Sequence, residues 1–168
     1  MWTFFLEDLG KKAVGIDNNK TMLLIAEEYK KLKNKKSKFF YSDLRRYAYN
    51  KFDSAIMMNN VIRVLSENDL IAVLNKLKDK VKNLIIELDK KKLKSGTFKY
   101  RFNNFDIIEV IKKKNKKVYE RYFFNKQTGA SFKILSYSYG LKRMLGAYGC
   151  ISIKKTKDSY FYLLEFKP

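Results

Sequence analysis

The chain has 168 residues, the length of one ordinary domain, and its 46% apolar and 15% aromatic content is too high for a disordered protein. Lys and Arg number 37 against 17 Asp and Glu, so the formal net charge is +20. The sequence contains no His and one Cys, Cys150, which excludes a His general base, a His or Cys metal site and an intrachain disulfide.

The N-terminus and the apolar runs bear on where the protein works. The first residues lack the basic start and cleavage site of a signal peptide, and the apolar runs are far shorter than the roughly 20 residues that cross a membrane. We therefore expect a cytoplasmic protein without a membrane partner. The net charge is mostly lysine, since only six basic residues are Arg. Solvated lysine faces from a biased composition would explain this charge, and so would a nucleic-acid-binding surface.

Apolar spacing in the first half of the chain predicts helices and strands in alternation. A short helix at 3–9 would end at Gly10, the favoured residue just past a helix terminus. Further helices are expected at 20–32 and 68–80, and strands at 13–16, 38–41, 52–58 and 83–88. These strands are continuously apolar, which is typical of a parallel sheet with both faces covered.

The last third of the chain has a different pattern. Two segments at 105–112 and 117–124 alternate in polarity and are rich in aromatic and β-branched residues, which predicts an antiparallel pair joined by a turn. A helix at 139–148 and strands at 150–155 and 160–166 would follow. Because no repeat, low-complexity tract or linker interrupts the chain, we expect a single domain.

Polar side chains follow the predicted strands at the edge where parallel α/β sheets bind ligands. Asp17 follows the first strand, Asp43 the second, and Asn59 and Asn60 the third, while Glu87 and Asp89 lie at the end of the fourth. A carboxylate can accept hydrogen bonds from both hydroxyls of a ribose, or from an adenine amino group. Each of these residues could equally be an ordinary helix cap or strand-end residue.

The order of these segments resembles that of the class I S-adenosylmethionine-dependent methyltransferases. The likeness lies in Val14–Asn19, the helix Met22–Tyr29, Phe40–Leu44, Lys51–Ile56 with its pair Phe52-Asp53, and Asn60–Leu65. The resemblance implies an α/β fold, a Rossmann-like three-layer sandwich with a mostly parallel sheet, antiparallel C-terminal strands and an antiparallel insert. It also implies one methyltransferase-like domain over 1–168, with a cofactor-side half at about 1–89 and a substrate-side half at about 90–168.

The same resemblance implies S-adenosylmethionine as the cofactor and gives roles to the first candidate residues. Asp17 would bind the ribose hydroxyls, and Asn18 would lie against the adenine. Asp43 would accept a hydrogen bond from the adenine amino group, with the backbone of Leu44 nearby.

On the acceptor side, the resemblance places Asn59 and Asn60 beside the methionine part and the entering substrate. Arg63 stands where many relatives have His, Glu87 is the best carboxylate candidate for the substrate, and Tyr122 follows a basic and aromatic stretch. That stretch could bind phosphates and stack bases, or form the solvated and apolar faces of a substrate-covering insert. The acceptor could be a small molecule, an RNA or a protein. A non-catalytic module that binds RNA or a partner is the alternative function.

The chain departs from the family at its start. The family's first strand, with the glycine-rich loop that wraps the methionine end of the cofactor, should precede the first helix, yet that helix begins directly after Met1-Trp2. This strand is central in the sheet, so without it both neighbours would lose their backbone partners. We expect a sequence truncated upstream, a strand supplied by another chain in an oligomer, or a degenerate relative.

Overall fold

The computed structural model of the protein describes residues 2–89, 93–102, 105–138 and 140–166. The chain divides into two compact units, Met1–Asn50 (unit 1) and Lys51–Pro168 (unit 2). Within the described ranges, no helix combines the length and the apolar character that crossing a bilayer requires. The expectation of one domain over the whole chain stays a prediction.

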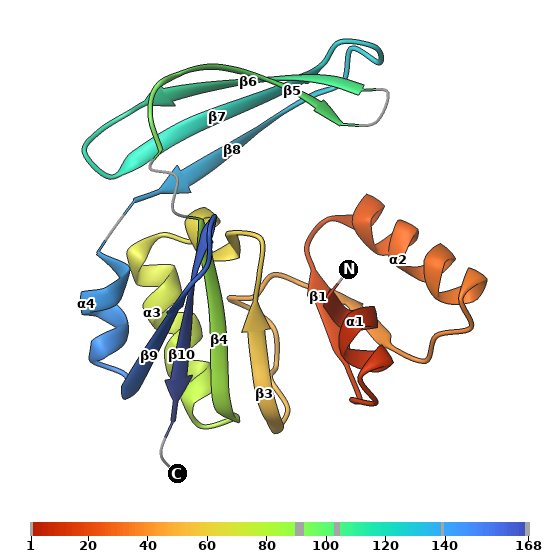
Figure 1. Ribbon diagram of the computed structural model, residues 1–168, viewed down its shortest axis with the longest axis vertical. Coiled ribbons are helices and arrows are strands. Elements are labelled where there is room, and N and C mark those ends of the chain that lie inside the picture. The colour runs from red at the N-terminus through yellow and green to blue at the C-terminus, as the bar shows by residue number, and fades with distance from the viewer. Residues whose placement is uncertain (1, 90–92, 103–104, 139, 167–168) are drawn as a thin grey trace. The chain divides into compact units, whose positions relative to one another are not determined.

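Unit 1 consists of two helices and a pair of parallel strands (Figure 1). Its elements are, in chain order, α1 (Trp2–Asp8), β1 (Val14–Asp17), α2 (Lys20–Leu32) and β2 (Lys38–Tyr41). Gly15 of β1 lies opposite Phe39 of β2 in the parallel register. The side chain of Asn19 caps the start of α2 by accepting a hydrogen bond from the N–H of Met22 at 3.2 Å. The four elements predicted for this part of the sequence are confirmed.

Phe4 of α1 lies at the centre of the small core of unit 1. It is buried, and its ring centroid lies 4.9 Å from that of Tyr29 and 5.3 Å from that of Phe39. Phe39 also explains the glycine at position 15, because a Cβ there would lie 2.6 Å from the Phe39 ring. The ring thus packs directly on the strand backbone, and a side chain at position 15 would push the two apart.

Unit 2 begins with a four-stranded sheet and its helices (Figure 1). The elements are β3 (Phe52–Met57), the short 3-10 helix η1 (Val61–Val64), α3 (Glu67–Lys78), β4 (Val81–Asp89), α4 (Leu141–Gly146), β9 (Cys150–Lys155) and β10 (Ser159–Glu165). The strand order is β3-β4-β10-β9, in which β3 and β4 are parallel while β10 is antiparallel to both β4 and β9. The prediction of an α/β fold with antiparallel C-terminal strands is confirmed.

The core of unit 2 lies between α3 and this sheet. Leu70, Leu74 and Leu77 repeat at helical spacing along α3 and are fully buried. Leu84 and Ile86 alternate along β4 and are fully buried too. The periodicities of 3.6 and 2 therefore bury the apolar faces of both elements against each other, which fixes the position of β4 and of the residues at its end.

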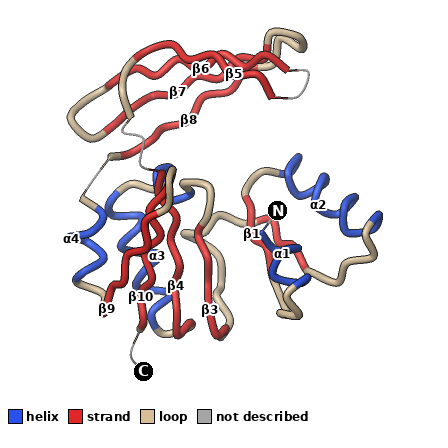
Figure 2. The backbone as a smooth tube through the Cα atoms, in the orientation of Figure 1, coloured by secondary structure: helices blue, strands red, loops and turns tan. Residues whose placement is uncertain are grey.

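A second sheet in unit 2 is antiparallel throughout, and Figure 2 shows it as a separate group of strands. Its strands, in the order β5-β6-β7-β8, are β5 (Gly96–Phe102), β6 (Phe105–Lys113), β7 (Val118–Asn125) and β8 (Ser131–Tyr137). The predicted antiparallel insert is therefore confirmed; β6 and β7 correspond to the two strands expected there, and β5 and β8 were not expected. β5 and β8 are strands because they pair along most of their length with β6 and β7.

β1 and β3 are both edge strands in the described part of the chain. β1 pairs there with β2 alone, and β3 pairs there with β4 alone. Each parallel pair therefore has one row of backbone N–H and C=O groups without a strand partner among those residues. By the sequence resemblance, these are the two strands that would flank the family's first strand.

Candidate functional site

The strand ends of unit 1 place Asp17 and Asp43 at the same edge of the β1–β2 pair. Asp17 is the last residue of β1, and its carbonyl accepts a hydrogen bond from the N–H of Ser42 at 3.0 Å. Its Oδ1 accepts from the N–H of Asn19 at 2.8 Å, while its Oδ2 has no hydrogen-bond partner among the described residues. Asn18 is exposed beside it. Asp17 therefore retains one oxygen that can accept a hydrogen bond from a ligand.

The carboxylate of Asp43 is already bound by Arg45. The guanidinium donates to both oxygens, from Nε to Oδ1 at 2.9 Å and from Nη2 to Oδ2 at 2.5 Å, and the backbone N–H of Arg45 donates to Oδ1 at 2.8 Å. The side-chain hydrogen bonds from Arg45 lower the pKa of Asp43 to about 2. The next residue is also engaged, because the carbonyl of Leu44 accepts from the hydroxyl of Tyr49 at 2.8 Å.

The strand ends of unit 2 bring Asn59 and Glu87 together, although 28 residues separate them in the sequence. The N–H of Asn59 donates to Oε2 of Glu87 at 2.7 Å, and the buried Ser159 donates from Oγ to the other oxygen, Oε1, at 3.1 Å. Glu87 thereby joins β4 to the turn after β3 and to the start of β10. Sequence reasoning missed Ser159, since only the register between β10 and β4 places it here.

Asn60 makes a second set of bonds at the same edge. Its Nδ2 donates to Oδ2 of Asp89 at 3.0 Å, and its Oδ1 accepts from the N–H of Asp89 at 2.8 Å. Arg63 of η1 donates from Nη2 to the carbonyl of Asp89 at 3.1 Å. Asp89 was expected at this edge from its position after the fourth strand but was given no role, and its bonds make it a central residue of the site.

The backbone between β3 and η1 is held in an uncommon conformation. Asn59 and Asn60 have φ values of 56° and 60°, in the left-handed region that most residues other than Gly seldom adopt and that Asn tolerates best. Two such residues in succession are unfavourable, and the bonds to Glu87 and Asp89 compensate for that cost. Conformations of this kind are concentrated at ligand-binding and active sites, so this turn is the strongest structural indication of a ligand site in unit 2.

The chemistry available at these strand ends is that of oxygen acceptors and amide groups. Carboxylates and carboxamides bind hydroxyl, amino and ammonium groups. In the described part of the chain, no three acidic or cysteine side chains are grouped so that they could hold a metal ion. The arrangement is suited to positioning an organic ligand.

Tyr122 lies in the antiparallel sheet and is engaged by its neighbours there. Its hydroxyl donates to Oε2 of Glu120 at 2.8 Å. The ammonium groups of Lys112 and Lys133 lie 5.5 Å and 5.3 Å from the centre of its ring. No contact joins Tyr122 to Asn59, Asn60 or Glu87 among the described residues, so its role toward a substrate stays a prediction.

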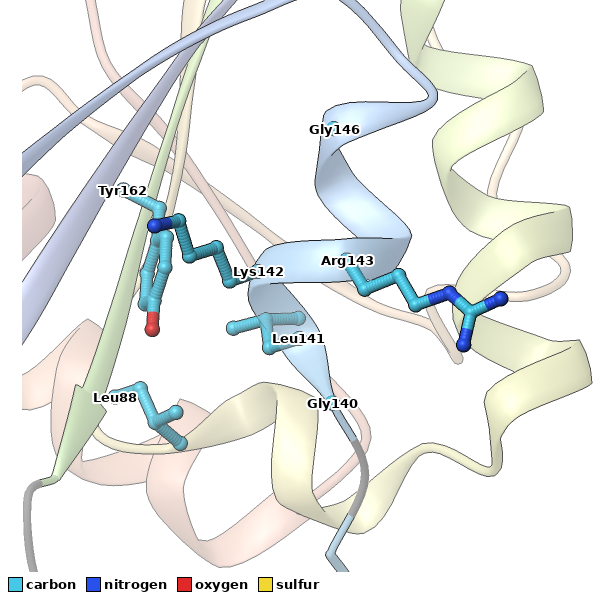
Figure 3. Close-up of a pocket in the computed structure, with 7 residues that line it drawn as sticks. All are labelled: Leu88, Gly140, Leu141, Lys142, Arg143, Gly146 and Tyr162. Carbon is cyan, nitrogen blue, oxygen red and sulfur yellow. The ribbon is translucent and has the colours of Figure 1, made fainter.

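A hollow of about 610 Å³ lies beside α4 in unit 2 (Figure 3). Leu88, Leu141 and Tyr162 form its apolar walls, and Lys142 lies beside Tyr162 while Arg143 extends away from both. Burial raises the pKa of the Tyr162 hydroxyl. The polar groups around the hollow do not converge on one point, and none of the predicted site residues lines it.

Comparison with known proteins identifies the fold. No protein-family model and no curated protein matches the sequence. A S-adenosylmethionine-dependent methyltransferase from Clostridium acetobutylicum ATCC 824 matches with a TM-score of 0.75 and 15% identity over 94% of this chain and 76% of that one. The PH0226 protein from Pyrococcus horikoshii OT3 matches with a TM-score of 0.74 and 20% identity, over 99% and 78% of the two chains.

A third match is the glycopeptide N-methyltransferase MtfA complexed with (S)-adenosyl-L-homocysteine. Its TM-score is 0.62, with 10% identity over 98% of this chain and 76% of that one. At such identities the matches show the fold alone. The chain has the class I S-adenosylmethionine-dependent methyltransferase fold, as its sequence resemblance predicted.

Proposed function

We propose that this chain binds S-adenosylmethionine and transfers its methyl group to a small organic acceptor. The observation that supports this most strongly is the fold match, over 94% of the chain or more, to methyltransferases that include one solved with the product S-adenosylhomocysteine. The proposal also agrees with the placement of Asp17, Asn59 and Glu87 at carboxyl ends of parallel strands, where ligands bind in α/β folds.

In unit 1 the residues present suit the adenosine part of the cofactor. The unpartnered Oδ2 of Asp17 would accept from a ribose hydroxyl, and the exposed Asn18 would lie against the adenine. Asp43 would accept from the adenine amino group only if Arg45, half of whose side chain is exposed, turned away from it. The backbone of Leu44 would lie beside the ring.

In unit 2 the site residues would orient the acceptor. S-Adenosylmethionine supplies a methyl group that is already activated by its sulfonium, so an enzyme mainly aligns the acceptor and excludes water. Asn59 and Asn60 would line the methionine and acceptor side, held in place by Glu87 and Asp89. An acceptor that is already nucleophilic needs no general base, which is consistent with the absence of His and with Arg63 in its place.

The basic side chains near Tyr122 favour a small acceptor over a nucleic acid. Lys133 pairs with Glu120 at 2.7 Å, Lys114 lies 3.9 Å from the same carboxylate, and Lys112 covers the Tyr122 ring. These cations are engaged within the sheet, and the Tyr122 ring is covered rather than open for base stacking.

The edges of β1 and β3 that are unpaired within the described ranges support the proposal that the active form is an oligomer. Their backbone groups have no strand partner on one side among the described residues, so a strand from a second copy of the chain could pair with them. Such an exchange would make the active form an oligomer. Sedimentation with and without S-adenosylhomocysteine tests this, and a monomer that binds the product would contradict it.

Calorimetric titration with S-adenosylhomocysteine tests the cofactor proposal. We predict that Asp17→Ala weakens binding by about 1–3 kcal/mol, because hydrogen bonds from the ribose to a charged group are lost. The matched control is Asp79→Ala, which removes an exposed carboxylate from the end of α3. Equal affinity of the wild type and Asp17→Ala would refute the role of Asp17. A folded wild-type chain that does not bind would favour a non-catalytic module instead.

A further inference from the structure

One face of the antiparallel sheet contains a buried ion pair. Neighbouring residues of a strand point to opposite faces, and the registers of β5 to β8 place alternate residues side by side. We name the face that includes Glu109 the Glu109 face. The members used below are Phe98, Tyr100, Glu109, Tyr119, Arg121, Phe123, Phe132 and Ser136.

Glu109 is fully enclosed and both of its oxygens are bonded. Its exposure is 2%, its Oε1 accepts from Nε of Arg121 at 2.5 Å, and its Oε2 accepts from the hydroxyl of Tyr100 at 2.8 Å. A buried charge is costly unless it is paired and hydrogen-bonded in this way. The carboxylate therefore holds two side chains, a guanidinium and a phenol, in fixed positions on this face.

Arg121 keeps most of its hydrogen-bonding capacity. Only its Nε is bonded, and its two terminal nitrogens have no hydrogen-bond partner within the described ranges. Its guanidinium carbon lies 5.0 Å from the centre of the Phe123 ring, and its side chain is 22% exposed. A guanidinium that is fixed through Nε and by a ring is prepared to bind an anionic group through its other two nitrogens.

Aromatic rings lie on the same face of the sheet as the Arg121 guanidinium. The Phe123 and Phe132 rings are stacked with centroids 4.7 Å apart, and Phe98, Tyr100 and Phe132 are all more than one third exposed. Exposed aromatic rings on a single face form a platform on which another planar ring can stack. The Glu109 face thus offers an oriented cation next to an aromatic platform.

The Glu109 face also lies near the strand ends of the first sheet in unit 2. Tyr119 and Ser136 on this face are buried, and β8 contacts η1. Burial and the hydrogen bond to Glu109 raise the pKa of Tyr100.

We propose that the Glu109 face binds the methyl acceptor, and that this acceptor has an anionic group, carboxylate or phosphate, attached to a planar apolar ring. Arg121 would bind the anion through its two terminal nitrogens, and the ring of Phe132, which is 60% exposed, would stack on the planar part. Glu109 and Tyr100 are positioning residues, since they act through Arg121. This inference rests on the proposed function for the identity of the ligand as an acceptor, but anion binding itself does not need the cofactor.

Anion binding is tested on the full chain with three small probes of similar shape. Benzoate and phenyl phosphate carry the two anionic groups, and benzamide is a neutral match to benzoate. Their affinities are measured by saturation-transfer NMR titration, with S-adenosylhomocysteine titrated separately on the same samples. We expect the anionic probes to bind more tightly than benzamide, and the tighter of the two identifies the anion.

Variants then assign the binding to Arg121. Arg121→Gln should weaken the anionic probe on the order of tenfold, because charge-assisted hydrogen bonds are lost. Arg121→Lys keeps a positive charge beside Glu109 but lacks the two terminal nitrogens that would bind the anion together. It should therefore also bind the anionic probe more weakly, and it tests the role of Arg121 if Arg121→Gln fails to fold. The control is Arg101→Gln on the opposite face, where Arg101 pairs with Asp106 at 3.0 Å.

The possible results separate the two proposals. Equal binding of benzamide, an unchanged affinity in both Arg121 variants, or no binding of any probe would overturn this inference. If the chain binds S-adenosylhomocysteine but the anionic probes fail, the cofactor proposal stands without it. If the probes bind through Arg121 but S-adenosylhomocysteine does not bind, the anion site stands and the methyltransferase proposal fails.

Discussion

Arg45 lowers the pKa of Asp43, one of the predicted cofactor residues. Its side chain and backbone donate three hydrogen bonds to Asp43, and the resulting pKa of about 2 lies below the ordinary value of 3.8. A carboxyl group with a lowered folded-state pKa stabilises the fold above its unfolded pKa. That stabilisation is lost as the pH falls from about 4 to about 2.

We predict that Arg45→Ala raises the pKa of Asp43 toward about 4, because the hydrogen bonds from Arg45 are the main cause of the shift. The unfolding free energy of the variant should therefore fall less between pH 4 and pH 2 than that of the wild type. Carbon-detected NMR titration of the carboxyl group and denaturant melts at each pH measure the two effects. A pKa that stays near 2 in the variant would show that another group binds Asp43.

The residues of the site differ in how far the sequence reveals them. Asn59 and Glu87 were each predicted at a strand end, because parallel strands end at a common edge, and in the structure they are hydrogen-bonded to each other. Ser159 could not be predicted, since it reaches Glu87 only through the antiparallel register of β10, 72 residues away. The engagement of Asp43 by Arg45 depends on side-chain geometry within one turn, which residue spacing does not determine.

At the scale of elements, α3 depends on a side-chain cap. The Oγ of Ser66 accepts a hydrogen bond from the N–H of Asp69 at 3.1 Å, which satisfies one of the free amides of the first turn. The helix covers the core side of β4 and thus supports the strand that ends at Glu87 and Asp89.

We predict that Ser66→Ala lowers the unfolding free energy of the protein by about 1 kcal/mol, because the capping bond is lost. Chemical denaturation followed by circular dichroism measures the change. The control is Ser152→Ala at an exposed position of β9, where a surface substitution should change stability by less than about 0.5 kcal/mol. Similar effects of the two substitutions would mean that Ser66 does not act as a cap.

The local residue pattern was sufficient to predict some helices and strands but not others. The strands of both parallel pairs were predicted within a few residues, because their apolar runs are bounded by polar turns. β5 and β8 were missed because their strand structure depends on pairing with β6 and β7 across a sheet. The helix expected at 139–148 is shorter at its C-terminal end, where α4 stops at Gly146; position 139 lies outside the described residues.

At the scale of the whole molecule, the parallel strands form two separate pairs. β1 with β2 and β3 with β4 each end in polar residues that the resemblance assigns to one cofactor. The fold was predictable from the order of these segments, and the structural matches confirm it.

The most direct measurement is an amide chemical-shift titration of the wild-type chain with S-adenosylhomocysteine. The account predicts saturable shifts at the strand ends of unit 1, in residues 14–19 and 41–44, and at Asn59 and Asn60 in unit 2. Such shifts would locate the adenosine and methionine parts of the cofactor at the proposed residues. No shifts from a folded chain, or shifts confined to the hollow beside α4, would contradict the assignment of this protein as an S-adenosylmethionine-binding methyltransferase.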